Sequence, residues 1–252
     1  MTAPIKRRQF AARIWSKLVS FDKAHRLLER HDRVLAAVSG GPDSVCLAHF
    51  LAQMARRKGF SLALIHVHHG LRGRSADKDL ALVERLGRLL GLEVIVARID
   101  VRAQASARGR GLEEAGRKAR YAAIRRASRK LDCNKASTGH HLDDQAETVL
   151  LNLLRGTRLS ALGGIPPARP LAPGLSLIRP LLCLSRSEII AYLKRHQLPY
   201  RMDASNRSLR FTRNWIRWRV LPELERGQPR IREHLAGIAS QVRHSLTRPD
   251  SI

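Results

Sequence analysis

A run of small and acidic residues stands between an apolar segment, residues 34–38, and a segment with helical spacing that begins at residue 44. The run reads Ser39-Gly40-Gly41-Pro42-Asp43-Ser44. Glycines let a backbone approach an anion closely, hydroxyls donate hydrogen bonds, and the start of a helix presents free N–H groups. The run is therefore predicted to bind phosphate, with Asp43 placed to hold Mg²⁺. A glycine turn capped by serine and aspartate is the structural alternative.

A second group of polar residues follows the apolar run at 135–138. His140 and Asp144 are four residues apart, as are Asp143 and Glu147. Each pair can share one face of a helix that starts near Asp143. A histidine beside carboxylates and a nucleotide suits phosphate contact, metal positioning or proton transfer. For Asp143 and Glu147, a helix cap and a solvated surface position are the open alternative.

Elements that would position these groups follow from the apolar pattern. Strands are expected at 34–38, 62–67, 94–99 and 135–138, and helices at 44–57, 76–90, 112–131 and 143–154. This alternation predicts an α/β fold, a doubly wound, mostly parallel sheet whose strand ends carry the ligand.

Three parts are expected along the chain. Residues 1–33 form a basic N-terminal helix, and residues 34–174 form the domain that carries the predicted phosphate-binding run and the second polar group, ending in a Gly- and Pro-rich loop at 156–174. Residues 175–252 form a small helical, basic extension that completes the active site, contacts RNA and ends in a helix near 231–246. From residue 177 onward this extension counts 15 Lys and Arg against 6 acidic residues.

Composition points to a polyanionic partner. The 252 residues include 47 Lys and Arg against 21 Asp and Glu, a formal net charge of +26, and 38 of the 47 are Arg. The arginine fork fits phosphate and stacks on bases, so RNA or DNA is expected to bind. A high-GC genome would explain the ratio of Arg to Lys but not the net charge.

Other classes of protein are excluded by the same sequence. No apolar run approaches the ~20 residues of a membrane-spanning helix, so no membrane partner is expected. The three cysteines are far apart and form no CxxC pair, which indicates a reducing, cytoplasmic location and excludes a cysteine-rich zinc module. The basic first twenty residues fit an amphipathic helix better than an import signal. The GxxxxGK[ST] loop of ordinary kinases is absent, and Gly109-Arg110-Gly111 lacks the third glycine of a dinucleotide fingerprint.

The run at 39–44 resembles the PP-loop of the N-type ATP pyrophosphatases, which cleave ATP between the α and β phosphates. Further segments are similar to motifs of the tRNA(Ile)-lysidine synthetases, and the resemblance covers roughly residues 10–222. They are His66-Val67-His68-His69-Gly70-Leu71-Arg72, the stretch 112–121, Thr138-Gly139-His140-His141-Leu142-Asp143-Asp144-Gln145-Ala146-Glu147-Thr148, Asp203-Ala204-Ser205-Asn206 and Arg213-Asn214-Trp215-Ile216-Arg217. His68 stands where that family usually has Asn or Asp.

This resemblance implies ATP-dependent ligation of free L-lysine to C2 of the wobble cytidine of tRNA(Ile) with the anticodon CAU. ATP adenylylates the C2 oxygen and releases pyrophosphate, and the ε-amine of lysine then displaces AMP. The implied cofactors are ATP and Mg²⁺. The implied residues are Ser39, Gly40, Gly41, Pro42, Asp43 and Ser44 for ATP, with Asp43 also holding the metal; Asp43, His140, Asp144 and Arg213 for catalysis; and Glu113, Arg117 and Arg120 for contact with lysine or tRNA.

Other interpretations stay open. Another PP-loop tRNA enzyme, such as a 2-thiocytidine synthetase, would call for paired cysteines, and a non-catalytic RNA-binding protein would need only the charge. A zinc site from His66, His68 and His69 lacks a settled third ligand. Trp215 and Trp218 could stack on RNA bases, although aromatic residues three apart on a helix are more often core. A homodimer is also left open.

Overall fold

The computed structural model of the chain describes residues 3–68, 74–99, 112–202 and 212–247, and of residues 3–11, 74–75, 112–113 and 247 it describes the backbone alone. Within these ranges the expected strands and helices are present with shifts of a few residues at their ends, except that the N-terminal helix ends at His25 and does not continue to residue 33. None of the described helices is long and apolar enough to cross a lipid bilayer.

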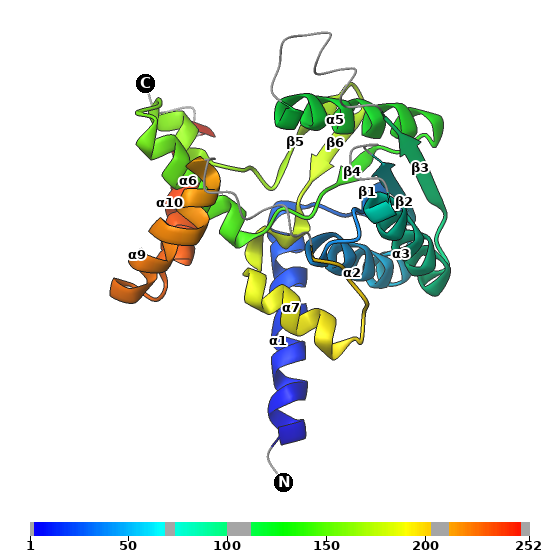
Figure 1. Ribbon diagram of the computed structural model, residues 1–252, viewed down its shortest axis with the longest axis horizontal. Helices are drawn as coiled ribbons and strands as arrows, with labels where there is room; N and C mark the ends of the chain where they lie inside the picture. The colour runs from blue at the N-terminus through cyan, green and yellow to red at the C-terminus, as the bar shows by residue number, and fades with distance from the viewer. Residues whose placement is uncertain (1–2, 69–73, 100–111, 203–211, 248–252) are drawn as a thin grey trace.

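A six-stranded sheet with the order β3-β2-β1-β4-β6-β5 forms the centre of the molecule (Figure 1). Its strands are β1 (Arg33–Ala37), β2 (Ser61–His68), β3 (Val94–Arg98), β4 (Lys135–Ser137), β5 (Ala168–Ala172) and β6 (Leu175–Ile178). All neighbours pair in parallel except β5 and β6, which are antiparallel. The chain runs from β1 outward to β3 and returns to β4 on the other side of β1. The carboxyl ends of β1 and β4 therefore form the switch point where such sheets bind ligands.

Helices cover both faces of the sheet, which confirms the predicted doubly wound fold. One face carries α2 (Pro42–Lys58) and α3 (Arg74–Leu90), with α1 (Ala3–His25) and α7 (Arg186–Arg195) packed against α2 in one apolar core. The opposite face carries α5 (Leu112–Lys130), as Figure 1 shows. Helices cover both faces of the central strands, and this burial on both faces accounts for their nearly continuous apolar sequences.

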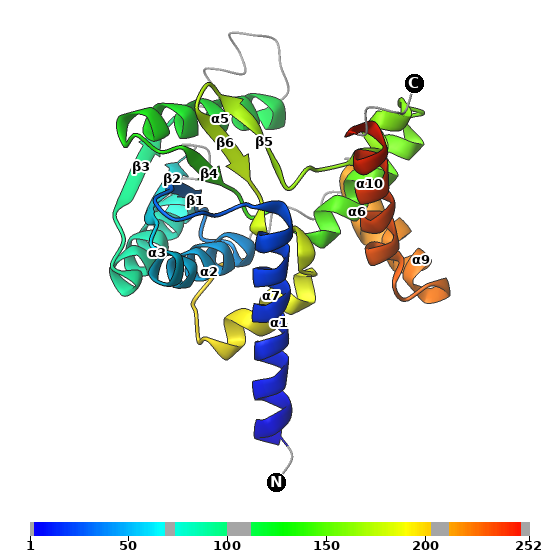
Figure 2. The same cartoon turned by 180° about the vertical axis from the view of Figure 1, so that it is seen from behind.

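A helical lobe stands beside the sheet in both views (Figures 1 and 2). It consists of α6 (Leu142–Leu154), the 3₁₀ helix η1 (Leu159–Gly163), α8 (Thr212–Trp215), the π-helical segment η4 (Ile216–Val220), α9 (Leu221–Gly227) and α10 (Ile231–Thr247). Its core joins Ala146, Val149 and Leu150 of α6 to Ile216, Leu221, Leu235 and Ala239. Helix α6 thus begins just after the carboxyl end of β4, and its apolar side packs against the other helices of this lobe.

The boundary expected at residue 174 does not separate structural units. It lies in the turn between β5 and β6, and β6 pairs in parallel with β4. The 3₁₀ helix η2 (Pro180–Cys183) and α7 then add Leu181 and Ile189 to the same core as α2. The sheet domain therefore extends past the predicted division, because the hairpin β5–β6 is too short and too rich in Pro and Arg to show a strand pattern.

Candidate active site

The glycine-rich loop, residues 39–44, joins the end of β1 to the first turn of α2. Gly40 has a φ of +88°, a conformation that favours glycine. Gly41 caps α2, and Pro42 occupies its first turn. The first N–H groups of a helix have no partner within it, and here they face the switch point of the sheet. The loop is therefore built as an anion site.

Two serine hydroxyls hold the loop in shape. The Oγ of Ser44 donates to the carbonyl of Gly41 (2.9 Å) and accepts from the N–H of Ser39 (3.1 Å). The Oγ of Ser39 accepts from the N–H of Gly41 (3.4 Å) and lies 3.2 Å from the Oγ of Ser44. Both hydroxyls are expected to donate to phosphate. In this structure they also fix the conformation of the backbone that would approach the phosphate.

The segment after β4 packs directly on this loop. A Cβ atom added at Gly139 would lie 3.1 Å from the carbonyl carbon of Asp43 and 3.2 Å from the nitrogen of Ser44. No larger side chain fits there without moving the backbone. This close approach brings the residues after Gly139 to the glycine-rich loop.

Two histidines follow, with opposite electrostatic character. His140 precedes α6 and bonds through Nδ1 to the Oγ1 of Thr138 (2.9 Å). Burial lowers the pKa of His140 to about 4, with a further contribution from Arg179 and Arg213, so its imidazole is neutral at neutral pH. The expected pairing of His140 with Asp144 on one helix face is wrong, because the helix begins at Leu142.

His141 instead occupies the cap position of α6. Its backbone N–H donates to Asp144 Oδ2 (3.1 Å), and its ring nitrogens lie 3.5 Å from Asp143 Oδ2, 3.5 Å from Asp144 Oδ2 and 3.8 Å from Asp43 Oδ1. Burial alone would lower the pKa of His141, but Asp144, Asp143 and Asp43 outweigh it and raise that pKa. Burial likewise opposes ionisation of Asp144, yet His141, His140 and Arg213 hold its pKa below the usual value.

Asp43 fits the role of a magnesium ligand. Its Oδ2 accepts a hydrogen bond from the guanidinium of Arg186, while its Oδ1 is buried without a hydrogen-bond partner among the described residues. Burial raises the pKa of Asp43, and His141 and Arg186 oppose that rise. Mg²⁺ is usually held by one or two carboxylates together with substrate phosphates and water. A carboxylate oxygen left open beside a phosphate-binding loop meets that requirement.

Arginines from the helical lobe neutralise the remaining carboxylates. Glu147 accepts from Arg213 Nε (2.8 Å) and from Arg217 Nε (2.5 Å) and Nη2 (2.9 Å). The Oδ1 of Asp144 accepts from Nη2 of both arginines, at 3.2 and 3.3 Å. Glu147 is fully buried, so the interpretation of this residue as solvated surface is wrong. These ion pairs hold α8 and η4 against α6 within the lobe.

The PP-loop domain family matches residues 11–224, a range that includes the loop, the histidines and the arginines of the site. The chain belongs to the PP-loop family.

Curated relatives of this PP-loop protein include two enzymes named tRNA(Ile)-lysidine synthase, which confirms the resemblance predicted from the motifs. The enzyme of Symbiobacterium thermophilum is 44% identical over 220 residues, which is 87% of this chain and 45% of that protein. The enzyme of Dehalococcoides mccartyi is 39% identical over 221 residues, 86% of this chain and 47% of that protein. The chain thus spans about half the length of the curated relatives it matches.

Solved structures agree on the fold. The U34-tRNA thiolase NcsA from Methanococcus maripaludis superimposes with a TM-score of 0.73 at 20% identity, over 92% of this chain and 79% of that one. At this identity the likeness concerns the fold alone, and it confirms the predicted PP-loop α/β architecture.

Two of the three expected substrate contacts, Arg117 and Arg120, lie apart from the PP-loop. Arg117 and Arg120 lie exposed on α5, and neither has a contact with the loop among the described residues. Glu113 lies in the first turn of α5, and its side chain is outside the description. The segments 69–72 and 203–206 of the resemblance also lie outside the described residues.

The zinc interpretation finds no support in the described residues. The Nδ1 of His66 donates to the carbonyl of Val38 (2.9 Å), and Nε2 of His68 lies 3.4 Å from Asp77. No group of three or more potential metal-ligating side chains occurs in the part of the chain that the structure describes. His69 lies outside that part.

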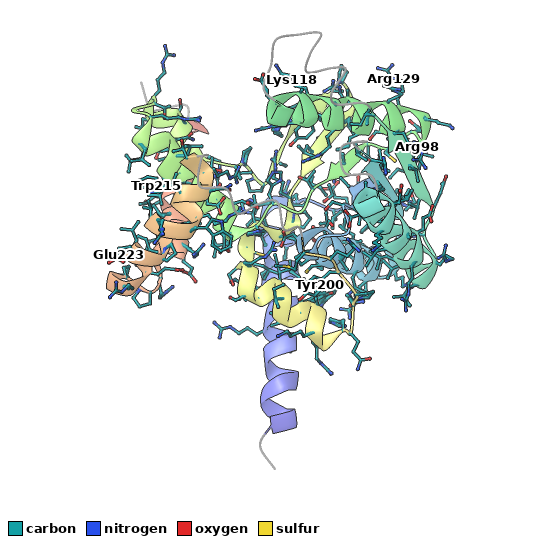
Figure 3. All side chains as sticks on the ribbon, viewed as in Figure 1. Arg98, Lys118, Arg129, Tyr200, Trp215 and Glu223 are labelled. Carbon is teal, nitrogen blue, oxygen red and sulfur yellow. The ribbon has the colours of Figure 1, made fainter. Side chains whose placement is uncertain are left out.

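Trp215 and Trp218 are surface residues. They are 43% and 52% exposed, so their interpretation as core is wrong. Trp215 lies on the helical lobe (Figure 3). Ile216, between them in sequence, enters the core of the lobe instead.

Sequence reasoning missed four residues of the site. Arg217 could have been identified from the sequence, since it stands four residues after Arg213 and shares its helix face. His141 could also have been identified, because it follows His140 directly at the start of a helix. Arg186 pairs with Asp43, and Arg232 of α10 donates to Asp143 Oδ1 (2.6 Å). These last two had no local signal, because they approach from distant segments of the chain.

Proposed function

We propose that this PP-loop protein uses ATP to join free L-lysine to the wobble cytidine of tRNA(Ile) with the anticodon CAU, forming lysidine. ATP would transfer its adenylyl group to the C2 oxygen of the base and release pyrophosphate, and the lysine ε-amine would then displace AMP. One observation carries the proposal: a chain 44% identical to a named tRNA(Ile)-lysidine synthase brings its PP-loop against a His and Asp cluster at the switch point of the sheet.

Proposed roles follow from the charges of the site. The PP-loop and the first turn of α2 would bind the phosphates, and Asp43 would hold Mg²⁺, which supplies charge neutralisation on the phosphates when bound. His140 is neutral, so it can orient a reacting group by hydrogen bonding but carries no charge for the phosphate. Charge neutralisation on the transferring phosphate therefore belongs to Arg213.

Arg213 suits that role because its position is fixed before substrate arrives. Ion pairs to Asp144 and Glu147 orient its guanidinium, and the side chain is still 38% exposed. A preoriented charge costs no reorganisation during the reaction. Asp144 would act chiefly by positioning His141 and Arg213, both of which it contacts.

The tRNA would approach the exposed side of the helical lobe. Trp215 and Trp218 offer aromatic faces for unpaired bases, and the exposed Arg219 beside them offers charge for phosphates. Arg117, Arg120 and Glu113 of α5 stay proposed contacts for lysine or tRNA. We further propose a cytoplasmic location, because the cytoplasm contains tRNA and keeps cysteine thiols reduced.

Sulfur transfer, as in the 2-thiocytidine synthetases, is the less favoured reaction. It would call for paired cysteines, whereas Cys46, Cys133 and Cys183 are all free thiols. Cys46 is buried within α2, and burial raises the pKa of its thiol well above the usual value, which disfavours the reactive thiolate.

Product analysis tests the first step. With tRNA present, the protein should convert ATP to AMP and pyrophosphate, and Asp43→Asn should remove most of that activity. Asp132→Asn is a matched control, since Asp132 is exposed and pairs with Arg33 away from the site. ADP and orthophosphate as the stoichiometric products would refute the assignment.

A further inference from the structure

Arg186 opens helix α7 at the edge of the PP-loop. Its backbone N–H donates to Asp143 Oδ2 (2.8 Å), which fixes the start of the helix beside α6. Its guanidinium reaches across to Asp43 Oδ2, the carboxylate that the site offers to a metal ion. The Asp143 carboxylate of α6 thus holds the backbone of Arg186, and the Asp43 carboxylate of α2 holds its guanidinium.

The side chain of Arg186 is held less firmly than the other arginines of the site. Arg213 and Arg217 each bond to both Glu147 and Asp144, and Arg232 bonds to both Asp143 and Glu225. Arg186 bonds through its side chain to Asp43 alone among the described residues, and it is 37% exposed. Most of its five N–H donors therefore stay open to an incoming ligand.

Binding of ATP with its metal would change the balance of charge at this contact. A divalent cation on Asp43 would repel the neighbouring guanidinium and weaken its attraction to the carboxylate. The same ligand brings a polyphosphate to the loop that contains Asp43, within the reach of a long arginine side chain. Arginine binds phosphate oxygens with short, charge-assisted hydrogen bonds, often two at once.

We propose that Arg186 is a phosphate-binding residue of this site, held on Asp43 in the nucleotide-free protein and transferred to the polyphosphate when ATP and its metal bind. The inference rests on the proposed function in taking ATP as the ligand of the loop. In the free protein the contact keeps the buried Asp43 paired. In the complex the same arginine neutralises the phosphates that leave as pyrophosphate.

Binding measurements without tRNA or lysine test this exchange. The probes are Mn²⁺, followed by electron paramagnetic resonance, and inorganic pyrophosphate, followed by calorimetry in the presence of Mg²⁺. Arg186→Gln should bind Mn²⁺ more tightly than the parent and pyrophosphate more weakly, each by about tenfold, the scale of one charge-assisted hydrogen bond. The gain in Mn²⁺ affinity should vanish in the double variant Arg186→Gln with Asp43→Asn.

Arg195→Gln is the matched control, because Arg195 is exposed at the far end of the same helix and should change neither affinity. Arg186→Lys keeps one charge and should lie between parent and Arg186→Gln in both assays, which also serves if the glutamine variant fails to fold. An unchanged pyrophosphate affinity, or an Mn²⁺ affinity that is unchanged or weaker, would show a purely structural ion pair and overturn the inference. Absence of lysidine synthesis by the parent would refute the proposed function without affecting these binding results.

Discussion

Replacing Glu147 by glutamine should strongly destabilise the packing of α8 and η4 against α6 in the helical lobe. The Glu147 carboxylate is 0% exposed and accepts from Arg213 and Arg217 at 2.5 to 2.9 Å. Glutamine keeps the volume but leaves two guanidinium groups to share Asp144. Removing one partner of a buried ion pair costs about 3–5 kcal/mol, and partial exposure of the arginines, 38% and 29%, favours the lower value, about 3 kcal/mol.

Urea unfolding and thermal unfolding of the variant measure this loss. A loss of 3 kcal/mol corresponds to a fall in Tm of roughly 6–12 °C for a chain of this size. Glu223→Gln is the control, since Glu223 forms an exposed ion pair with Arg226 on α9 and its loss should cost at most about 0.5 kcal/mol. Adding Arg217→Met to Glu147→Gln should recover part of the loss, because it removes one uncompensated charge. A Glu147→Gln variant as stable as the Glu223→Gln control would refute the reasoning.

Three further predictions concern RNA binding and acid stability. Trp218→Ala should weaken tRNA binding by about tenfold, the scale of one stacked base; a filter-binding assay in which the folded variant shows parental affinity would contradict the proposed surface. The logarithm of tRNA affinity should fall with the logarithm of salt concentration, and an interface of about six phosphate contacts would give a slope of roughly −4 to −5; affinity independent of salt would exclude an electrostatic interface. Burial lowers the pKa of His49 and of His140 to about 4, so between pH 6.5 and 4 the unfolded chain binds more protons and stability falls as pH falls. His49→Gln should flatten that fall in urea unfolding, and an identical pH dependence in both proteins would count against the shift at His49.

The central strands and the PP-loop could be predicted because their signals are local. Apolar runs such as 34–38 end directly in the glycines, and the four strands of the parallel core are all found near their expected positions. Strands β5 and β6 could not be predicted, since Arg169, Pro170 and Gly174 interrupt any apolar alternation. They are recognised as strands only by pairing with each other and with β4.

Contacts between side chains that are far apart in the sequence could not be predicted from the sequence. The spacing of His140, Asp144 and Glu147 indicated a functional cluster, but a shift of one residue in the helix start brought His141 to the carboxylates. The pairing of Arg186 with Asp43 spans 143 residues, and no periodicity encodes such a contact. The exposed position of Trp218 likewise depends on which face of the lobe is covered.

Nucleoside analysis of tRNA tests the central claim most directly. Purified tRNA(Ile) with the anticodon CAU is incubated with the protein, ATP, Mg²⁺ and labelled lysine, then digested and separated by chromatography with mass detection. The account predicts label in lysidine at the wobble position, formed with release of AMP and pyrophosphate and lost in Asp43→Asn. Label-free tRNA, from a protein that is folded and binds both ATP and this tRNA, would contradict the proposed function.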